Sequence, residues 1–277
     1  MISARYIVDG QLTVLTPLSL GRGQEEEAWP DSAATLEPNA TPRLEKDNSV
    51  PAPIAAIEMD HRGLPFLPGT AIKGLLRSRA ATALDNCYED KIEALLGGLP
   101  LKGRDAANVS ADVAIGGMAE FHNALLPTGH IAAARPAIRG RTALHEGSRT
   151  AEDGQLQHDR IVAPATVFPV TIVLTGATDP DVALLLALMA LIDGSGAASA
   201  MGAGTSQGDG RVKWTLGTVR RFGQAEAERW IIGGPGVRWQ DLATPVLISP
   251  TVFAPNIDLR IEMHFTLQIE GPFLVAA

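Results

Sequence analysis

The stretch GLPFLPGTAIKGLLR, residues 63–77, decides the fold, because it predicts a sharp turn that runs directly into a helix. Pro68 and Gly69 favour a tight turn, and Thr70 is a natural N-cap for the helix that follows. Three apolar residues then share one face at helical spacing. They are Ile72, Leu75 and Leu76. The stretch therefore predicts a helix over residues 71–84 with one buried face.

The same helix predicts an anion-binding site at its start. A helix N-terminus offers unpaired N–H groups and the positive end of the helix dipole. Lys73 and Arg77 stand four residues apart, so they are neighbours on the helix and add positive charge. This combination suits a phosphodiester backbone. An ordinary capped helix with solvated Lys and Arg side chains is an equally good interpretation of these residues alone.

The rest of the chain mixes strands and helices without regular alternation. Alternating apolar residues predict a strand within residues 6–20, which ends at a flexible turn of Gly21, Arg22 and Gly23. Residues 24–53 carry an acidic run and spaced prolines, so they predict a long loop. The further elements expected are strands at 112–126, 161–174 and 211–214, and helices at 88–96 and 179–192, the latter capped by Asp179. This order favours an α+β sandwich of the ferredoxin-like kind.

The end of the chain resembles its beginning. Residues 265–274 echo residues 10–18, since in both a strand pattern leads to a proline followed by an apolar residue. We therefore expect one domain over residues 1–218 and a linker over 219–257. The start of a second, truncated copy is expected at 258–277.

Composition limits the possible classes of protein. The formal net charge is −8, so RNA binding would have to depend on local basic patches. Cys87 is the only cysteine, which excludes an intrachain disulfide and a thiolate metal cluster. No secretory signal pattern is present, and the longest apolar run, residues 182–192, is too short to span a bilayer. The sequence predicts a soluble cytoplasmic protein without a membrane partner.

Three motifs, in order, carry a resemblance to a known family. They are TPLSLGRG at residues 16–23, GLPFLPGTAIKGLLR at 63–77 and the glycine-rich MGAGTSQGDGRV at 201–212. Together they resemble the signature of the RAMP superfamily, and in particular the backbone subunits of type III CRISPR interference complexes. The resemblance covers about the first 220 residues. It implies a ferredoxin-like (RRM-like) RAMP fold with long loops and a thumb hairpin.

The resemblance also implies a function. Such subunits stack along a guide RNA (crRNA), contact adjacent RAMP domains, and leave sequence recognition to pairing between guide and target RNA. The residues expected to line the phosphate path are Gly21, Arg22, Gly23, Lys73, Arg77, Gly202, Gly204, Ser206, Gly208 and Gly210. Glycines allow the backbone to approach phosphates closely.

An arginine-rich region is similar to the family's thumb hairpin, which presses between nucleotides of guide and target. It contains Arg135, Arg139, Arg141, Arg149 and Arg160, and of these we expect Arg139 and Arg141 to bind RNA. Local positive charge in this region would compensate for the acidic chain. A solvated arginine-rich loop is the competing interpretation.

Catalysis stays open at this point. In related subunits an aspartate in the loop after the first strand cuts target RNA with a divalent metal, and Mg²⁺ would be needed only in that case. Asp47 is the best candidate here, Asp31 is a poorer one, and Asp60 matches a structural acid before the turn. The histidines at 122, 130, 145 and 158 are too scattered to predict a zinc site.

Three functions therefore remain. The first is a non-catalytic backbone subunit that binds guide RNA. The second is the same scaffold acting as a metal-dependent endoribonuclease. The third is a protein-binding adaptor that has lost the ability to bind RNA.

Overall fold

The computed structural model describes residues 4–28, 52–84, 88–98, 116–127, 136–144, 151–195 and 199–252. Its centre is a five-stranded antiparallel sheet with the strand order β11-β10-β1-β9-β5. The strands are β1 (Arg5–Val14), β5 (Ala119–Phe121), β9 (Val167–Thr175), β10 (Val212–Phe222) and β11 (Thr244–Pro245). β1 is central because it pairs with β9 on one side and with β10 on the other.

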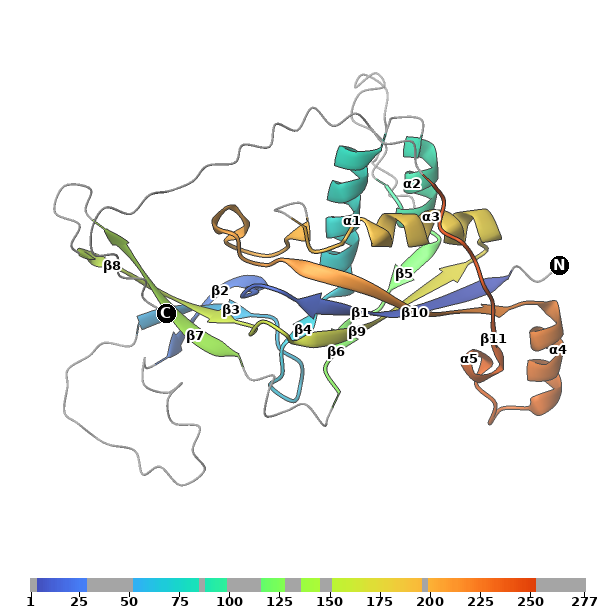
Figure 1. Cartoon of the computed structure of the whole chain (residues 1–277). Coiled ribbons are helices and arrows are strands. Elements are labelled where there is room, and N and C mark those ends of the chain that lie inside the picture. Colours follow the sequence, from blue (N-terminus) through green and yellow to red (C-terminus); the bar gives the residue numbers. More distant parts are fainter. Residues whose placement is uncertain are drawn as a thin grey trace, which may run out of the picture.

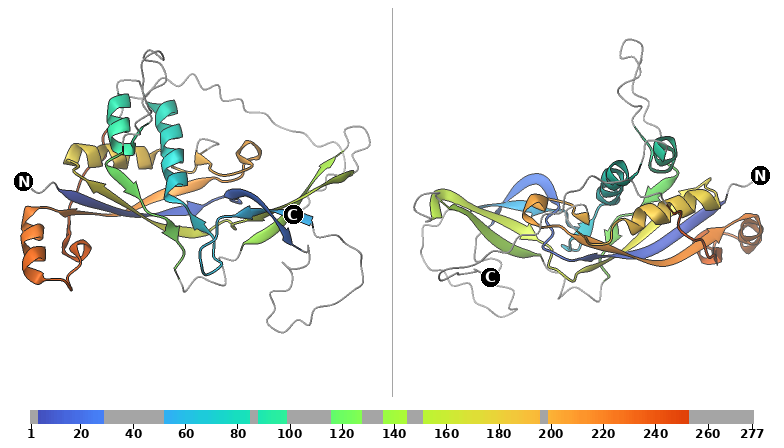
Figure 2. Two further views of the ribbon diagram at one scale, coloured as in Figure 1. Left: turned by 180° about the vertical axis from the view of Figure 1, so that it is seen from behind. Right: turned by 45° about the horizontal axis from the view of Figure 1, so that its top comes forward.

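Three helices lie on one face of this sheet, as Figures 1 and 2 show from several directions. They are α1 (Gly69–Ala83), α2 (Glu89–Leu96) and α3 (Asp179–Ala190). Along the chain the order is β1, α1, β5, β9, α3, β10. Along the chain, α1 follows β1 and α3 follows β9, and each helix connects two strands of the sheet. In the sheet itself, β1 lies between β9 and β10. None of the described helices combines the length and apolarity needed to cross a membrane.

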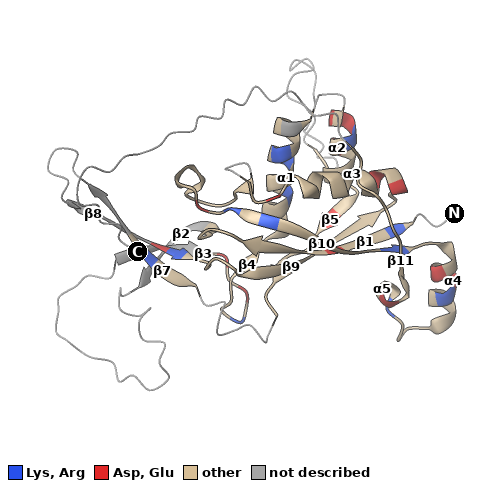
Figure 3. Ribbon diagram, in the orientation of Figure 1, with Lys and Arg blue, Asp and Glu red and all other residues tan. Residues whose placement is uncertain are grey.

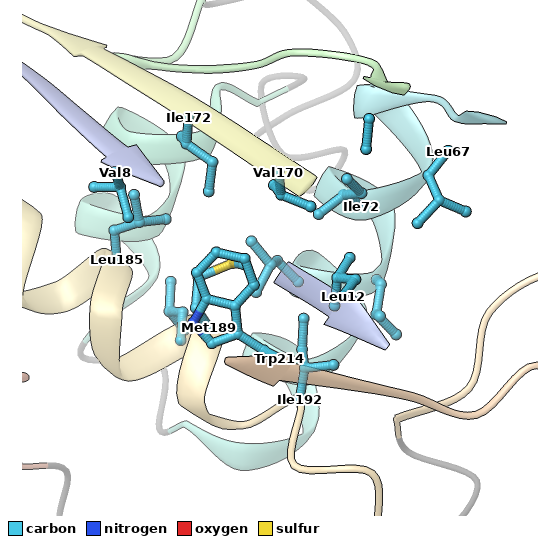
Figure 4. Packing of buried hydrophobic residues seen from close by; sticks show 14 of the residues in the cluster. Val8, Leu12, Leu67, Ile72, Val170, Ile172, Leu185, Met189, Ile192 and Trp214 are labelled. Atoms are coloured by element: carbon cyan, nitrogen blue, oxygen red, sulfur yellow. The ribbon is translucent and has the colours of Figure 1, made fainter. Parts of the chain in front are cut away.

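The core forms where alternate strand residues meet the helices (Figure 4). Val8 and Leu12 of β1 and Val170 and Ile172 of β9 are fully buried against α1 and α3. Trp214 of β10 packs into the same cluster. Its ring occupies the space beside Gly10, where a Cβ atom would overlap the indole. Every second residue of the strands faces the helices, and the Leu-rich α3 packs against these residues. Together they form one continuous core.

A second sheet extends from one end of the molecule, away from the three helices (Figure 1). Its strand order is β2-β3-β8-β7. The strands are β2 (Gly21–Ala28), β3 (Ala52–Ile57), β7 (Ala137–Leu144) and β8 (Ala151–Ile161). β7 and β8 pair as a long antiparallel hairpin. A two-stranded ribbon of β4 (Phe66–Leu67) and β6 (Ala124–Leu125) leads toward α1.

The helix starts differ from the sequence expectation. α1 begins at Gly69 with Pro68 as the N-cap, so the assignment of Thr70 was wrong. Asn123 accepts a hydrogen bond from the Gly69 N–H at 3.0 Å, and a Cβ on Gly69 would overlap the Phe121 carbonyl. The turn is thus fixed by tertiary contacts that no local pattern encodes.

α3 begins at Asp179, as expected, but the expected N-cap was wrong. Thr178, not Asp179, is its N-cap, and Thr178 forms a capping box with Asp181. Asp179 instead accepts a hydrogen bond of 2.6 Å from the Tyr6 hydroxyl, which ties the start of α3 to β1. Burial and this hydrogen bond raise the pKa of Tyr6 to about 12.

Two segments expected to be irregular carry secondary structure. The acidic run 25–27 lies in β2, so the predicted loop over 24–53 begins too early. β10 continues to Phe222, and the expected linker from residue 219 continues into α4 (Gln224–Gly233) and α5 (Trp239–Leu242). The aromatic ring of Phe222 packs edge-on against Trp230 and Trp239, which holds both helices on the sheet. Residues 258–277 lie outside the described part, so the domain division stays a prediction.

Asp60 shapes the turn that leads into β4 and α1. Its carboxylate accepts hydrogen bonds from the backbone N–H groups of Arg62 and Leu64 at 2.8 and 3.0 Å, and forms an ion pair with the Arg62 side chain. Arg62 also donates to the Leu126 carbonyl. Burial disfavours the charged carboxylate, but these hydrogen bonds outweigh burial and lower the pKa of Asp60. The expectation of a structural acid here is confirmed.

We predict that Gly10→Ala lowers the free energy of unfolding by about 1–3 kcal/mol, because the new methyl group would displace the Trp214 ring. Gly74→Ala is the matched control, since Gly74 lies within α1 with open space around it. This control should leave stability unchanged or raise it by up to about 1 kcal/mol. Denaturant unfolding of both variants measures the difference; equal effects would contradict this packing.

Asp60→Asn should lower the free energy of unfolding at neutral pH by about 1–3 kcal/mol, because the charged acceptor is lost. A carboxyl group with a lowered folded pKa stabilises the protein above its unfolded pKa of about 4 and loses that effect as pH falls through the folded pKa. The difference between wild type and variant should therefore shrink below about pH 4. A difference that is constant from pH 7 to pH 2 would count against this role.

Candidate nucleic-acid interface

A groove of about 890 Å³ lies where the three sequence motifs meet. Its described walls come from the start of β2, from α1, and from the loop before β10. The lining residues are Leu20, Gly21, Glu58, Pro68, Thr70, Ala71, Leu75, Ser78, Arg79, Thr82, Ala200, Met201, Gly202 and Ala203. The first turn of α1 and Gly202 of the late glycine loop therefore face one space, while Gly204, Gly208 and Gly210 are not among its lining residues.

Backbone hydrogen bonds hold the first and third motifs together. The Ala203 N–H donates to the Ser19 carbonyl at 2.8 Å, and the Gly210 N–H donates to the Pro17 carbonyl at 2.8 Å. The Arg211 N–H donates to the Thr16 hydroxyl at 2.9 Å. Two segments about 190 residues apart in sequence thus form one wall of the groove.

Two glycines make this close docking possible. Gly202 has φ +82°, and a Cβ there would overlap the Ser19 carbonyl. Gly210 has φ +74°, and a Cβ there would overlap the Met201 carbonyl. Any other residue at either position would strain the backbone. At position 202 it would also push the loop away from Ser19, and at position 210 it would push apart the two ends of the loop. Between them, Gly204 and Gly208 flank the short 3-10 turn Thr205–Gln207, which contains Ser206.

One face of α1 lines the groove, and it is not the face that carries Lys73 and Arg77. The groove side repeats at helical spacing through Ala71, Leu75, Ser78 and Thr82. Arg77 donates to the Leu96 carbonyl at 2.9 Å and also to the Gly97 carbonyl, so it satisfies the C-terminus of α2. Lys73 is half-buried, and burial together with Arg77 lowers its pKa. The structure therefore does not bring this pair to the groove, in contrast to the expectation.

Arg79, and not Lys73 or Arg77, is the basic residue of α1 that lines the groove. It is 9% exposed and donates to the Leu191 carbonyl at 3.3 Å. Arg79 and Glu58 are the only charged residues among the described lining residues. Arg79 follows Leu75 by four residues and Ala71 by eight, so it lies on nearly the same side of the helix. This spacing is the sequence signal that could have placed Arg79 at the groove.

Arg139 joins the hairpin to the glycine loop. Its guanidinium donates two hydrogen bonds to the Asp209 carboxylate, at 3.1 and 2.6 Å. The two side chains are 28% and 10% exposed. Arg139 is thus adjacent to the glycine loop, but its charge is matched by the Asp209 carboxylate. Basic and acidic residues are interspersed along the described ribbon as a whole (Figure 3).

Several predicted residues are placed only in part. Arg22 and Gly23 lie in β2 and Arg141 lies in β7, but the side chains of Arg22 and Arg141 fall outside the described part. Outside the described residues altogether lie Asp31, Asp47, His130, Arg135, His145 and Arg149. Asp47 would be the residue to hold Mg²⁺, so that prediction is not tested. Within the described ranges, no group of three His, Cys, Asp or Glu side chains could hold a metal.

Comparison with known proteins agrees with this geometry. The sequence model of the RAMP superfamily matches residues 11–213, a span that runs from the middle of β1 into the start of β10 and includes every wall of the groove. No match is found among curated proteins. Because the matched span covers well over half of the sequence, the chain belongs to the RAMP superfamily.

Proposed function

We propose that this chain is a guide-RNA-binding backbone subunit of a type III CRISPR interference complex and that the guide runs through the groove beside α1. Membership of the RAMP superfamily suggests a CRISPR-associated role in RNA binding. The single observation that carries the finer proposal is the convergence of the glycine turn, the first turn of α1 and the late glycine loop on one groove.

The groove suits a phosphodiester backbone for a reason other than high positive charge. The N-cap residue Pro68 provides no side-chain acceptor, and Asn123 accepts a hydrogen bond from the Gly69 N–H. Pro68, Thr70 and Ala71 line the groove, so the positive end of the α1 dipole lies beside it. Small residues on two walls, among them Gly21, Ala71, Gly202 and Ala203, allow RNA to approach the protein backbone. Arg79 adds one cation. Such a groove would recognise the shape of an RNA strand with little preference for its base sequence. Guided recognition requires this, because base pairing with the guide recognises the sequence.

The opposite face of the sheet is a poorer site for single-stranded RNA. Sheets that bind RNA on an open face stack bases on exposed aromatic side chains. On this face the described residues of β1, β9 and β10 include Gln11, Thr13, Thr171, Thr215 and Thr218. Phe222 is buried beneath Trp239. Trp239 lines a pocket at this face with Arg5, Arg220 and Arg238, but the Arg5 guanidinium already lies over its ring, 5.3 Å from the ring centroid. This difference favours the groove over the sheet surface.

Two finer structural features belong to the same proposal. The strand order β10-β1-β9-β5, with α1 and α3 as the crossing helices, supports a ferredoxin-like core. The β7–β8 hairpin supports the role of a thumb that contacts guide and target, since it extends away from the core next to the glycine loop. Adjacent RAMP domains and other effector subunits would be the protein partners, in the cytoplasm.

Cleavage of target RNA stays a prediction from the resemblance. If Asp47 holds Mg²⁺, the metal would polarise the scissile phosphate. Incubation of the assembled complex with complementary RNA and Mg²⁺, in wild type and in Asp47→Ala, tests this role. Cleavage that persists in the variant would remove Asp47 from the mechanism.

RNA that copurifies with the chain from its native host tests the proposed function. We expect short RNAs of uniform length that carry a repeat-derived tag at one end. Sequencing of the extracted RNA, with a mock purification as control, gives the answer. Absence of nucleic acid, or RNA that only mirrors cellular abundance, would favour the protein-binding adaptor.

Ser78→Glu should weaken binding of single-stranded RNA by about tenfold at low salt, because it places a negative charge in the groove beside the phosphates. Ser78 is exposed, so the fold should tolerate the change. Titration of a labelled oligonucleotide, followed by fluorescence anisotropy, measures the affinity.

Ala225→Glu is the matched control for this charge. Ala225 is an exposed residue of α4, which lies at the opposite end of the sheet from the hairpin (Figure 1). The control should leave the affinity nearly unchanged. An equal loss in both variants would mean that bulk charge, and not the groove, determines binding.

A further inference from the structure

The Arg139–Asp209 ion pair has the geometry of an arginine bound to a phosphate. A guanidinium group presents two parallel N–H donors, and a carboxylate and a phosphate accept them in the same bidentate manner. Here one terminal nitrogen lies 3.1 Å from Oδ1 and the other 2.6 Å from Oδ2 of Asp209. Asp209 therefore presents to Arg139 the same pair of acceptors that a phosphodiester would.

The surroundings keep this pair in place and close to the proposed RNA path. Asp209 lies between Gly208 and Gly210, and its N–H donates to the Gly204 carbonyl at 3.2 Å. The same loop continues from Gly202 and Ala203, which line the groove. Arg139 comes from the base of the hairpin, so the ion pair bridges the two elements that the guide would touch in succession.

Arg139 is not fully satisfied by this contact. Its Nε atom is buried and has no hydrogen-bond partner among the described residues. Asp159 faces Arg139 across the hairpin register, so a second acidic residue is placed opposite it. In the RNA-free protein the positive charge of Arg139 is thus paired with the Asp209 carboxylate. The proposed ligand is a polyanion that would pair with the same guanidinium group.

We propose that Asp209 is an internal competitor of the guide's phosphate for Arg139. This inference rests on the proposed function and adds a mode of regulation to that site. When RNA enters, a phosphate replaces the Asp209 carboxylate on the guanidinium, and the carboxylate turns to solvent. The exchange opposes binding, so only a strand held along the whole groove displaces the acid. The pair therefore weakens binding of short or poorly seated RNA while it keeps the hairpin ordered.

The test compares RNA affinity in a double-mutant cycle with Asp209→Asn, Arg139→Gln and the double variant. Asp209→Asn should bind a labelled single-stranded oligouridylate about tenfold tighter at low salt, because Arg139 is released to bind a phosphate. Its dependence of log affinity on log salt should be steeper by about 0.7, the value for one additional phosphate neutralised on a single strand.

The cycle separates a specific exchange from a general charge effect. Arg139→Gln should weaken binding severalfold, and the double variant should bind no tighter than Arg139→Gln alone. Glu228→Gln on the exposed face of α4 is the charge-matched control and should leave affinity unchanged. If thermal melting shows that Asp209→Asn is unfolded, Asp209→Ser, with its small side chain, replaces it in the cycle.

The possible outcomes are distinguishable. An unchanged or lower affinity of the folded Asp209 variant, or an equal gain in Glu228→Gln, overturns the competition while RNA binding itself stands. Absence of RNA binding by the folded wild-type protein at low salt overturns the proposed function and the competition with it.

Discussion

The groove depends on a few backbone hydrogen bonds that join residues 16–19 to the loop before β10. Pro17 and Ser19 provide the carbonyl acceptors, and Ala203 and Gly210 provide the donors. These bonds require glycine at positions 202 and 210, where side chains would overlap the opposite backbone. Since the first motif follows β1 and the last precedes β10, two neighbouring strands of one sheet bring the motifs together. The packed core beneath β1 thus determines the shape of the proposed RNA site.

An acidic protein that binds a polyanion has to control its local charge. Several arginines in the described part of the chain have internal partners. Arg77 satisfies carbonyls at the end of α2, Arg62 pairs with Asp60, and Arg139 pairs with Asp209. The described lining of the groove therefore presents backbone, a helix N-terminus and few charged side chains. Such a surface would hold RNA by close approach, and the paired arginines provide a way to adjust affinity.

Sequence reasoning anticipated the convergence of the motifs because glycine spacing and a proline–glycine turn have local physical meaning. It did not anticipate which face of α1 meets the groove, because the direction of Lys73 and Arg77 depends on where α2 packs. The pairing of Arg139 with Asp209, separated by 70 residues, had no local signal. Helices within residues 224–242 were not expected, because Gly233, Gly234 and Pro235 interrupt this stretch. These helices are held by Phe222, Trp230 and Trp239, contacts that a pattern cannot show.

Mapping of ultraviolet cross-links between the chain and its bound RNA tests the central claim most directly. Peptides that carry cross-linked nucleotides, identified by mass spectrometry, report which surface touches the strand. The account predicts cross-links within residues 68–82 and 200–211 and at the base of the β7–β8 hairpin. Cross-links concentrated on the open sheet face around Gln11 and Thr171, or on α4, with none along the groove, would contradict it.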